Sequence, residues 1–96
     1  ISIICFCNEL NELNTTENKF IEFIDCAYNH IEDLDVTKNV NLEGLSVEGN
    51  YLNSLNLKSN KLLTSLNIID NEISEIDTSQ NSLLTDIKKY KNSRTR

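Results

Sequence analysis

An asparagine recurs along this chain at alternating steps of ten and eleven residues, with no insertion or deletion to break the count. The complete repeat is therefore 21 residues long. A fixed period of this length predicts a solenoid, in which each repeat packs only against its neighbours. The recurring residues are Asn8, Asn18, Asn29, Asn39, Asn50, Asn60, Asn71, Asn81 and Asn92.

Apolar residues keep the same period, at six positions of each repeat when Ile21 is counted as position one. Position four is the column Ile3, Ile24, Leu45, Leu66 and Ile87, and position six is the column Cys5, Cys26, Val47, Ile68 and Lys89. Residues two apart point to the same side of a strand, so these two columns predict a short strand that faces a core. No single coil can shield such side chains, and stacked coils about 4.8 Å apart bury them.

The asparagines are predicted to hold the bends of each coil. A sharp bend leaves backbone N–H and C=O groups unpaired, and the asparagine amide carries both donors and an acceptor. Each amide can therefore satisfy backbone groups in its own coil and in the next one. Aspartate would keep the acceptor and lose the donors, and we assign none of these residues a catalytic role.

Charge is divided unevenly along the chain. Residues 1–87 contain all 15 acidic residues and only four lysines, so their net charge is −11, whereas residues 88–96 contain five basic residues. The acidic body argues against nucleic acid as a ligand. The basic segment is interpreted as a solvated cap or tail, with contact to an anionic surface as the alternative.

The repeat resembles a known family. The segments 42–52 (L-E-G-L-S-V-E-G-N-Y-L) and 63–73 (L-T-S-L-N-I-I-D-N-E-I) resemble the leucine-rich repeat consensus L-x-x-L-x-L-x-x-N-x-L. The segment 34–39 (L-D-V-T-K-N) is similar to the second half of the 21-residue bacterial repeats of internalin-J-like surface proteins, where cysteine also takes position six. The resemblance covers residues 1–92.

This resemblance implies a fold and a role. The fold is a right-handed, curved solenoid with a parallel β-sheet on its concave face and turns or irregular segments on its convex side. The role is protein binding, commonly on bacterial surface or secreted proteins. We therefore expect an extracellular or cell-surface location, with a cytoplasmic one left open. The expected partner is a protein, with a host or cell-surface protein as one option, and neither nucleic acid nor membrane insertion is expected.

The predicted binding surface is the concave face, which the outward residues at positions three, five and seven line. Its apolar side chains gather near the N-terminal end, and such grouping often marks a contact surface. Cover by an upstream coil or by another chain is an equally open interpretation. The candidate contact residues are Ile4, Phe6, Phe23, Asp25, Tyr28, Glu48, Asn67, Ile69, Lys88 and Tyr90.

Other chemistry is expected to be absent. Cys5 and Cys26 are predicted to be inward-facing free thiols, since strands in register point both Cβ atoms the same way, and Cys7 is an odd third cysteine. His30 is interpreted as a surface turn residue. The column Asn14, Asp35, Asn56 and Asp77 predicts a hydrogen-bonded structural ladder, with a Ca²⁺ site as the weaker alternative. We expect no enzyme activity, no metal and no cofactor.

The ends of the chain generate the competing hypothesis. Residues 1–83 are four 21-residue repeats, the first truncated at its start, and residues 84–96 are a degenerate last repeat with a cap and a basic tail. Lys89 and Arg94 place charge where the core would continue, which would stop stacking. The N-terminal coil has no such device and no initiator methionine, so we expect the natural chain to begin upstream. The alternative to partner binding is therefore a structural or assembly subunit that docks or self-associates through this N-terminal coil, and an intracellular effector role stays open.

Overall fold

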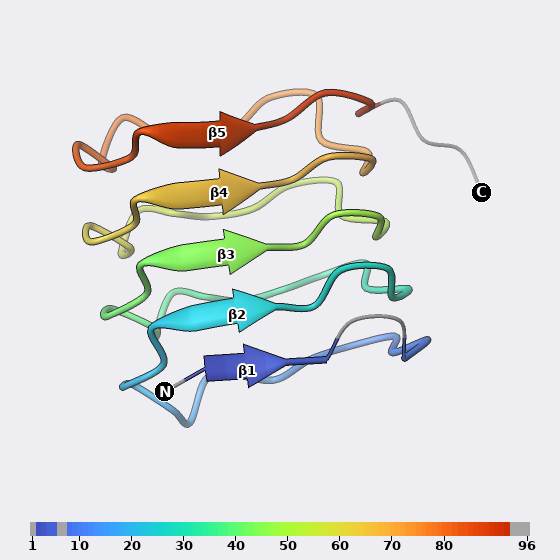
Figure 1. Cartoon of the computed structure of the whole chain (residues 1–96), viewed down its shortest axis with the longest axis horizontal. Coiled ribbons are helices and arrows are strands. Elements are labelled where there is room, and N and C mark those ends of the chain that lie inside the picture. The colour runs from blue at the N-terminus through green and yellow to red at the C-terminus, as the bar shows by residue number, and fades with distance from the viewer. Residues whose placement is uncertain (1, 6–7, 93–96) are drawn as a thin grey trace.

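The computed structural model describes residues 2–5 and 8–92, and within them the chain winds through a stack of similar coils. Each coil contributes one strand of three residues to a parallel sheet with the order β1-β2-β3-β4-β5 (Figure 1). The strands are β1 (Ser2–Ile4), β2 (Phe23–Asp25), β3 (Gly44–Ser46), β4 (Ser65–Asn67) and β5 (Asp86–Lys88).

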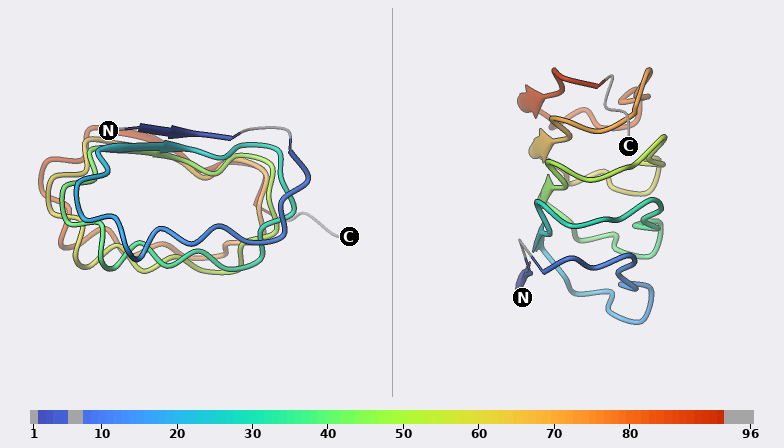
Figure 2. Two further views of the ribbon diagram at one scale, coloured as in Figure 1. Left: turned by 90° about the horizontal axis from the view of Figure 1, so that it is seen from below. Right: turned by 90° about the vertical axis from the view of Figure 1, so that its right-hand side faces the viewer.

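The register of the sheet equals the sequence period. Ile24 pairs with Ile3 on one side and with Leu45 on the other, and Leu45 pairs in turn with Leu66. Because every step is 21 residues, identical repeat positions lie directly above one another. Seen along the stack, successive coils nearly superimpose (Figure 2, left). The return paths of the described residues contain turns and irregular segments and no helix. The predicted parallel-sheet repeat solenoid is confirmed.

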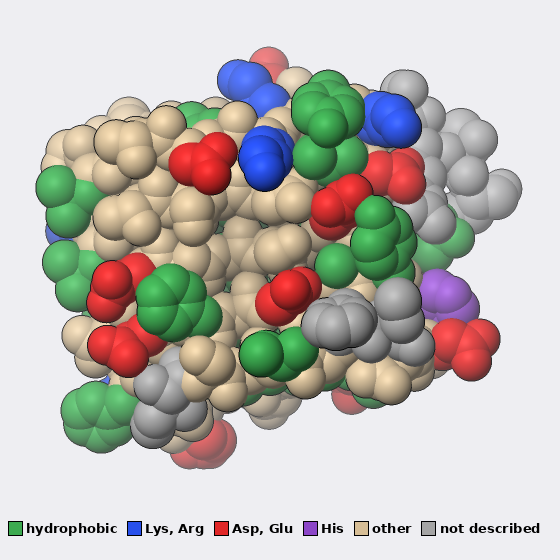
Figure 3. Space-filling model, viewed as in Figure 1, with side chains coloured by type: hydrophobic (Ala, Val, Ile, Leu, Met, Phe, Trp, Pro, Cys, Tyr) green, Lys and Arg blue, Asp and Glu red, His purple; other side chains and the backbone are tan. Residues whose placement is uncertain are grey.

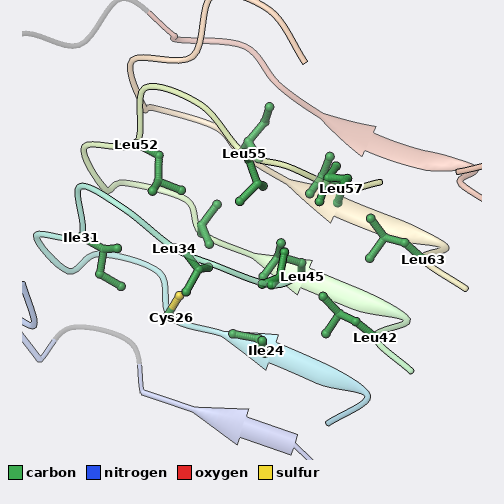
Figure 4. Close-up of a cluster of buried hydrophobic side chains, with 14 of the residues drawn as sticks. Ile24, Cys26, Ile31, Leu34, Leu42, Leu45, Leu52, Leu55, Leu57 and Leu63 are labelled. Atoms are coloured by element: carbon green, nitrogen blue, oxygen red, sulfur yellow. The ribbon is translucent and has the colours of Figure 1, made fainter. Parts of the chain in front are cut away.

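The core runs along the inside of the stack. Leu42, Leu52 and Leu63 are fully buried, and they contact the same positions of the neighbouring coils (Figure 4). Burial of each such side chain contributes about 1.5–3 kcal/mol. Ile3 at one end is only partly buried and Ile87 at the other is exposed, because β1 and β5 each have a single neighbouring strand in this structure.

The asparagines at position nine, which we call the first asparagine column, tie adjacent coils together just after the strands. The Asn50 Nδ2 donates to the carbonyls of Val47 in its own coil and Cys26 in the preceding coil, both at 3.0 Å. Its Oδ1 accepts the N–H of Ile31, also at 3.0 Å. Asn71 repeats this arrangement one coil later. The predicted bend role is confirmed, and the neighbour that the side chain reaches is the preceding coil, not the next one.

The asparagines at position nineteen, which we call the second asparagine column, lie where two consecutive turns of each coil meet. The backbone N–H of Asn60 donates to Leu57, and its carbonyl accepts the N–H of Leu63. The Asn60 Nδ2 donates to the carbonyls of Val36 and Asn39, both at 3.0 Å. The buried amide thus fixes the turn of its own coil onto the turn of the preceding coil.

In this second column, the residue at position sixteen decides whether the asparagine Oδ1 has a hydrogen-bond donor. The Asn39 Oδ1 accepts a hydrogen bond from the Thr15 Oγ1 at 2.7 Å. In the following coils position sixteen is Val36 and then Leu57, which have no hydroxyl. The Oδ1 atoms of Asn60 and Asn81 are accordingly buried without a hydrogen-bond partner.

This difference predicts opposite effects for two exchanges of similar volume. Thr15→Val should lower the free energy of unfolding by about 1–2 kcal/mol, since it leaves a third buried acceptor unpaired. Val36→Thr should raise it by about 1 kcal/mol, because the new hydroxyl can donate to Asn60. Urea unfolding of both variants beside the parent measures this, and a Thr15→Val protein as stable as the parent would contradict the assignment.

Candidate functional site

The outward side of the parallel sheet is the surface that the repeat leaves free to vary. We call it the sheet face, made of the residues at positions three and five of each strand and the residues that follow them at the strand ends. The described outward residues at positions three and five are Ser2, Ile4, Phe23, Asp25, Gly44, Ser46, Ser65, Asn67, Asp86 and Lys88.

A hollow of about 290 Å³ opens over the middle of the sheet face. Small residues line it on the two central strands, namely Gly44, Ser46 and Ser65. A Cβ atom on Gly44 would approach the ring of Phe23 to 2.8 Å, so the missing side chain lets that ring lie against the strand. Figure 3 views this face and shows the hollow flanked by hydrophobic and charged side chains.

Charged and aromatic groups line the hollow on both sides of its small-residue centre. Phe23 and Asp25 lie on β2, and Asp86 and Lys88 lie on β5. The combination offers an apolar ring, carboxylates and one cation around a shallow recess. Such a surface can accept side chains of a protein partner, and it contains no paired nucleophile and base.

A hydrogen-bonded row crosses the sheet face beside the hollow. The Tyr28 hydroxyl donates to the Glu48 Oε2 at 2.6 Å, and the Asn67 Nδ2 donates to the Glu48 Oε1 at 3.0 Å. Three coils in succession therefore share one carboxylate. Each of these residues was predicted as a separate contact residue, and the structure brings all three together. The sequence carries no sign of this row, because Tyr28, Glu48 and Asn67 occupy three different positions of the repeat.

A left-handed backbone position supports the row. Tyr28, Asp70 and Lys91 have φ values of 58°, 60° and 59°, and Gly49 has 72° at the same repeat position. A Cβ atom on Gly49 would lie 2.5 Å from the Tyr28 ring. The ring therefore lies directly over the glycine, and this contact holds the Tyr28 hydroxyl beside Glu48.

The remaining predicted contact residues divide into three groups. Ile4, Phe23 and Tyr90 are exposed as expected, whereas Phe6 lies outside the described residues. The expectation for Ile69 is wrong, because its side chain is only 6% exposed. Ile69 follows the end of β4, where the chain bends toward the left-handed Asp70, and a strand no longer holds its side chain outward.

The two described cysteines are free thiols, as predicted. Cys26 is buried, and its Sγ lies 3.7 Å from the Ser46 carbonyl. Burial, together with the nearby Cys5 and Asp25, raises the pKa of the Cys26 thiol to about 12. Burial likewise raises the pKa of the Cys5 thiol. Both are therefore poor nucleophiles at neutral pH. Cys7 lies outside the described residues.

The predicted ladder at position fifteen takes a different form. Hydrogen bonds of this column lie within each turn: the Asp35 Oδ1 accepts from the N–H and hydroxyl of Thr37, and the Asp77 Oδ1 accepts from the N–H of Ser79. These bonds hold the pKa of both carboxyls below the ordinary range. The column is a series of separate Asx turns and not a ladder between coils, because each oxygen meets a donor two residues on.

Within residues 2–5 and 8–92, no group of three or more His, Cys, Asp and Glu side chains is placed to hold a metal ion. His30 is exposed, as predicted, with its ring 6.1 Å from that of Tyr51. The described part of the chain contains no helix of the length and hydrophobicity that crossing a bilayer requires.

The period, the asparagine columns and the parallel sheet define a parallel β-solenoid with a 21-residue repeat, which is consistent with the leucine-rich repeat fold. No protein-family model and no curated protein sequence matches the chain. Among solved structures, the chain is similar to the functional domain of InlJ from Listeria monocytogenes, a structure described as including a cysteine ladder. The TM-score is 0.92 at 26% sequence identity, and the match covers 95% of this chain and 20% of that chain.

The contact between Gly49 and Tyr28 generates a prediction. Gly49→Ala should lower the free energy of unfolding by about 1–2 kcal/mol, since alanine is strained at positive φ, and should displace the tyrosine ring. Urea unfolding measures the first effect, and the chemical shifts of the Tyr28 ring measure the second. Gly44→Ala is the matched control, because it also meets a ring but has no positive φ. If Gly49→Ala had the same free energy of unfolding as the parent and unchanged chemical shifts of the Tyr28 ring, the role given to Gly49 would be contradicted.

Proposed function

We propose that this chain is a non-enzymatic protein-interaction module that binds a protein partner through the sheet face. The hollow over Gly44, Ser46 and Ser65 carries this proposal, because it is a recess on a face where residues vary from coil to coil. The inward residues at position four beneath it are apolar in every coil. Interaction surfaces combine aromatic anchors with a polar rim, and Phe23 with Asp25 on one side of the hollow and Asp86 on the other is of that kind.

The structural comparison supports the same class of function. The internalin-type fold is a protein-interaction scaffold, and the chain shares it at a TM-score of 0.92. Since the match spans 20% of the InlJ chain, the partner and the activity of that whole protein do not transfer. On the basis of the shared fold, we propose that the module is part of a secreted or surface-exposed protein.

A second function is favoured by the state of the first strand. Ile3 faces the core and is only partly buried on β1, and β1 pairs only with β2 in this structure. An open strand edge is a template for pairing with another chain. In this alternative the N-terminal coil docks onto a further coil or a second copy, and the sheet face is not the contact surface.

Capture experiments with matched variants separate these functions. The chain would be immobilised beside Ser46→Arg, which fills the hollow, and Ser54→Arg, which adds the same charge at an exposed position on the return path. The proposal predicts a protein retained by the parent and by Ser54→Arg and reduced at least about tenfold by Ser46→Arg. Retention that is equal on all three surfaces would contradict binding through the sheet face.

Sedimentation velocity of the parent and of Ile3→Lys tests the alternative, because Ile3 faces the end of the core and not the sheet face. A dimer that grows with concentration and disappears in Ile3→Lys would show that the N-terminal coil is an assembly edge. A parent that stays monomeric over a hundredfold concentration range would exclude self-association through that edge.

A further inference from the structure

A row of exposed apolar side chains runs along one edge of the stack, where each coil turns before entering its strand. We call this the turn edge, made of the paired turns at 16–20, 37–41, 58–62 and 79–83. Phe20 is 70% exposed, and Val40, Leu62 and Leu83 are 43–49% exposed. Hydrophobic side chains lie along the margin of Figure 3 from which the strands start. None of the four belongs to the core.

The turn edge also collects the basic residues. Lys19, Lys38, Lys58 and Lys61 are all the cations of residues 1–87, and all are exposed in these turns. With Glu17 as the one acidic residue, the four turns have a net charge of +3. The rest of residues 1–87 contains the other 14 acidic residues and no lysine or arginine. The lysines of residues 1–87 are thus confined to the turn edge, while Asp35 and Asp77, just before the turns, lie near Lys38 and Lys58.

The fold does not require this composition. Buried asparagines hold the turns through backbone carbonyls, as Asn39, Asn60 and Asn81 do. The side chains at the turn tips point to solvent, and a contact between them is the donation from the Lys61 Nζ to the Gln80 Oε1 at 3.1 Å. Scattered exposed apolar residues are ordinary, but four in adjacent coils beside four lysines form a continuous amphipathic strip.

We propose that the turn edge is a second binding surface, for an acidic amphipathic helix of a protein partner. Its apolar row would receive the apolar stripe of the helix, and its lysines would face glutamates or aspartates beside that stripe. The proposal concerns a surface separate from the sheet face and does not depend on the function proposed for that face.

Spacing favours a helix over an extended segment. Four apolar residues in adjacent coils span three steps of about 4.8 Å, or roughly 14 Å. Three helical turns rise about 16 Å, so residues three and four apart meet successive coils. Residues on one face of a strand repeat every 6.8 Å or so, and three such steps cover roughly 20 Å. The apolar side chains of a helix would therefore stay aligned with successive coils along the whole turn edge.

Charge placement favours a narrow partner over a membrane surface. Glu22 and Glu43 follow the turns directly at the starts of β2 and β3, and the whole chain has a net charge of −6. A broad anionic bilayer would meet these carboxylates as well as the lysines. A single helix, about 10 Å wide, can cover the apolar row and the lysines alone.

Fluorescence anisotropy with defined peptides tests the proposal. The probe is a labelled helical peptide of about 15 residues, with leucines three and four apart on one face and glutamates beside them. Its scrambled form and its lysine-for-glutamate form are the peptide controls. The paired variants are Phe20→Ser with Leu62→Ser, and Lys19→Gln with Lys61→Gln. Lys89→Gln with Lys91→Gln removes the same charge elsewhere, and circular dichroism confirms that each variant is folded.

The proposal predicts saturable binding of the acidic amphipathic peptide that both turn-edge variants weaken at least tenfold and the Lys89, Lys91 variant leaves unchanged. Equal binding of the scrambled peptide, equal binding to the turn-edge variants, or no binding up to millimolar peptide would overturn it. Co-sedimentation with phosphatidylserine vesicles that Phe20→Ser and Leu62→Ser abolish, without peptide binding, would assign the edge to a membrane instead. A dimer that these substitutions dissociate would assign it to a second copy.

Discussion

The hydrogen bond from an asparagine amide to a carbonyl of the preceding coil is the interaction on which this structure depends. Each strand has only three residues, and backbone hydrogen bonds such as that from the Tyr28 N–H to the Glu48 carbonyl continue the pairing of coils past the strand ends. Asn50 and Asn71 add bonds just after the strands, and Asn60 adds bonds at the opposite turns. These amides fix both bends of a coil on the coil before it, and the apolar columns then fall into register without helices on the return path.

Sequence periodicity predicted this architecture because the fold has one repeated environment. Once the period is 21 residues, strand register and core positions follow from it, as Leu45 over Ile24 shows. Side-chain contacts between unlike residues of adjacent coils did not follow. The sharing of Glu48 by Tyr28 and Asn67 depends on rotamers, and the burial of Ile69 depends on a bend beyond the strand end. Periodicity gives position and face, not the conformation of a variable side chain.

The difference between structural positions and variable positions explains where binding surfaces can lie. The residues at core and bend positions have structural roles, and even the Cys26 thiol is buried with its pKa raised to about 12. The residues at the outward positions and at the turn tips have no such structural role. On the sheet face they form a hollow lined by small residues between Phe23 and Asp86, and on the turn edge they gather lysines beside apolar side chains. One scaffold thus presents two surfaces of different charge.

Replacement of one asparagine of the first asparagine column tests most directly the claim that amide hydrogen bonds hold the coils together. Asn50→Asp keeps the acceptor for the Ile31 N–H and loses both donors to buried carbonyls, while Asn53→Asp makes the same change at an exposed position. Equilibrium unfolding at neutral pH should show a loss of about 3 kcal/mol or more for Asn50→Asp. Asn53→Asp should change stability by less than about 0.5 kcal/mol. Equal stability of the two variants would contradict the account, since the amide donors would then not hold the coils together.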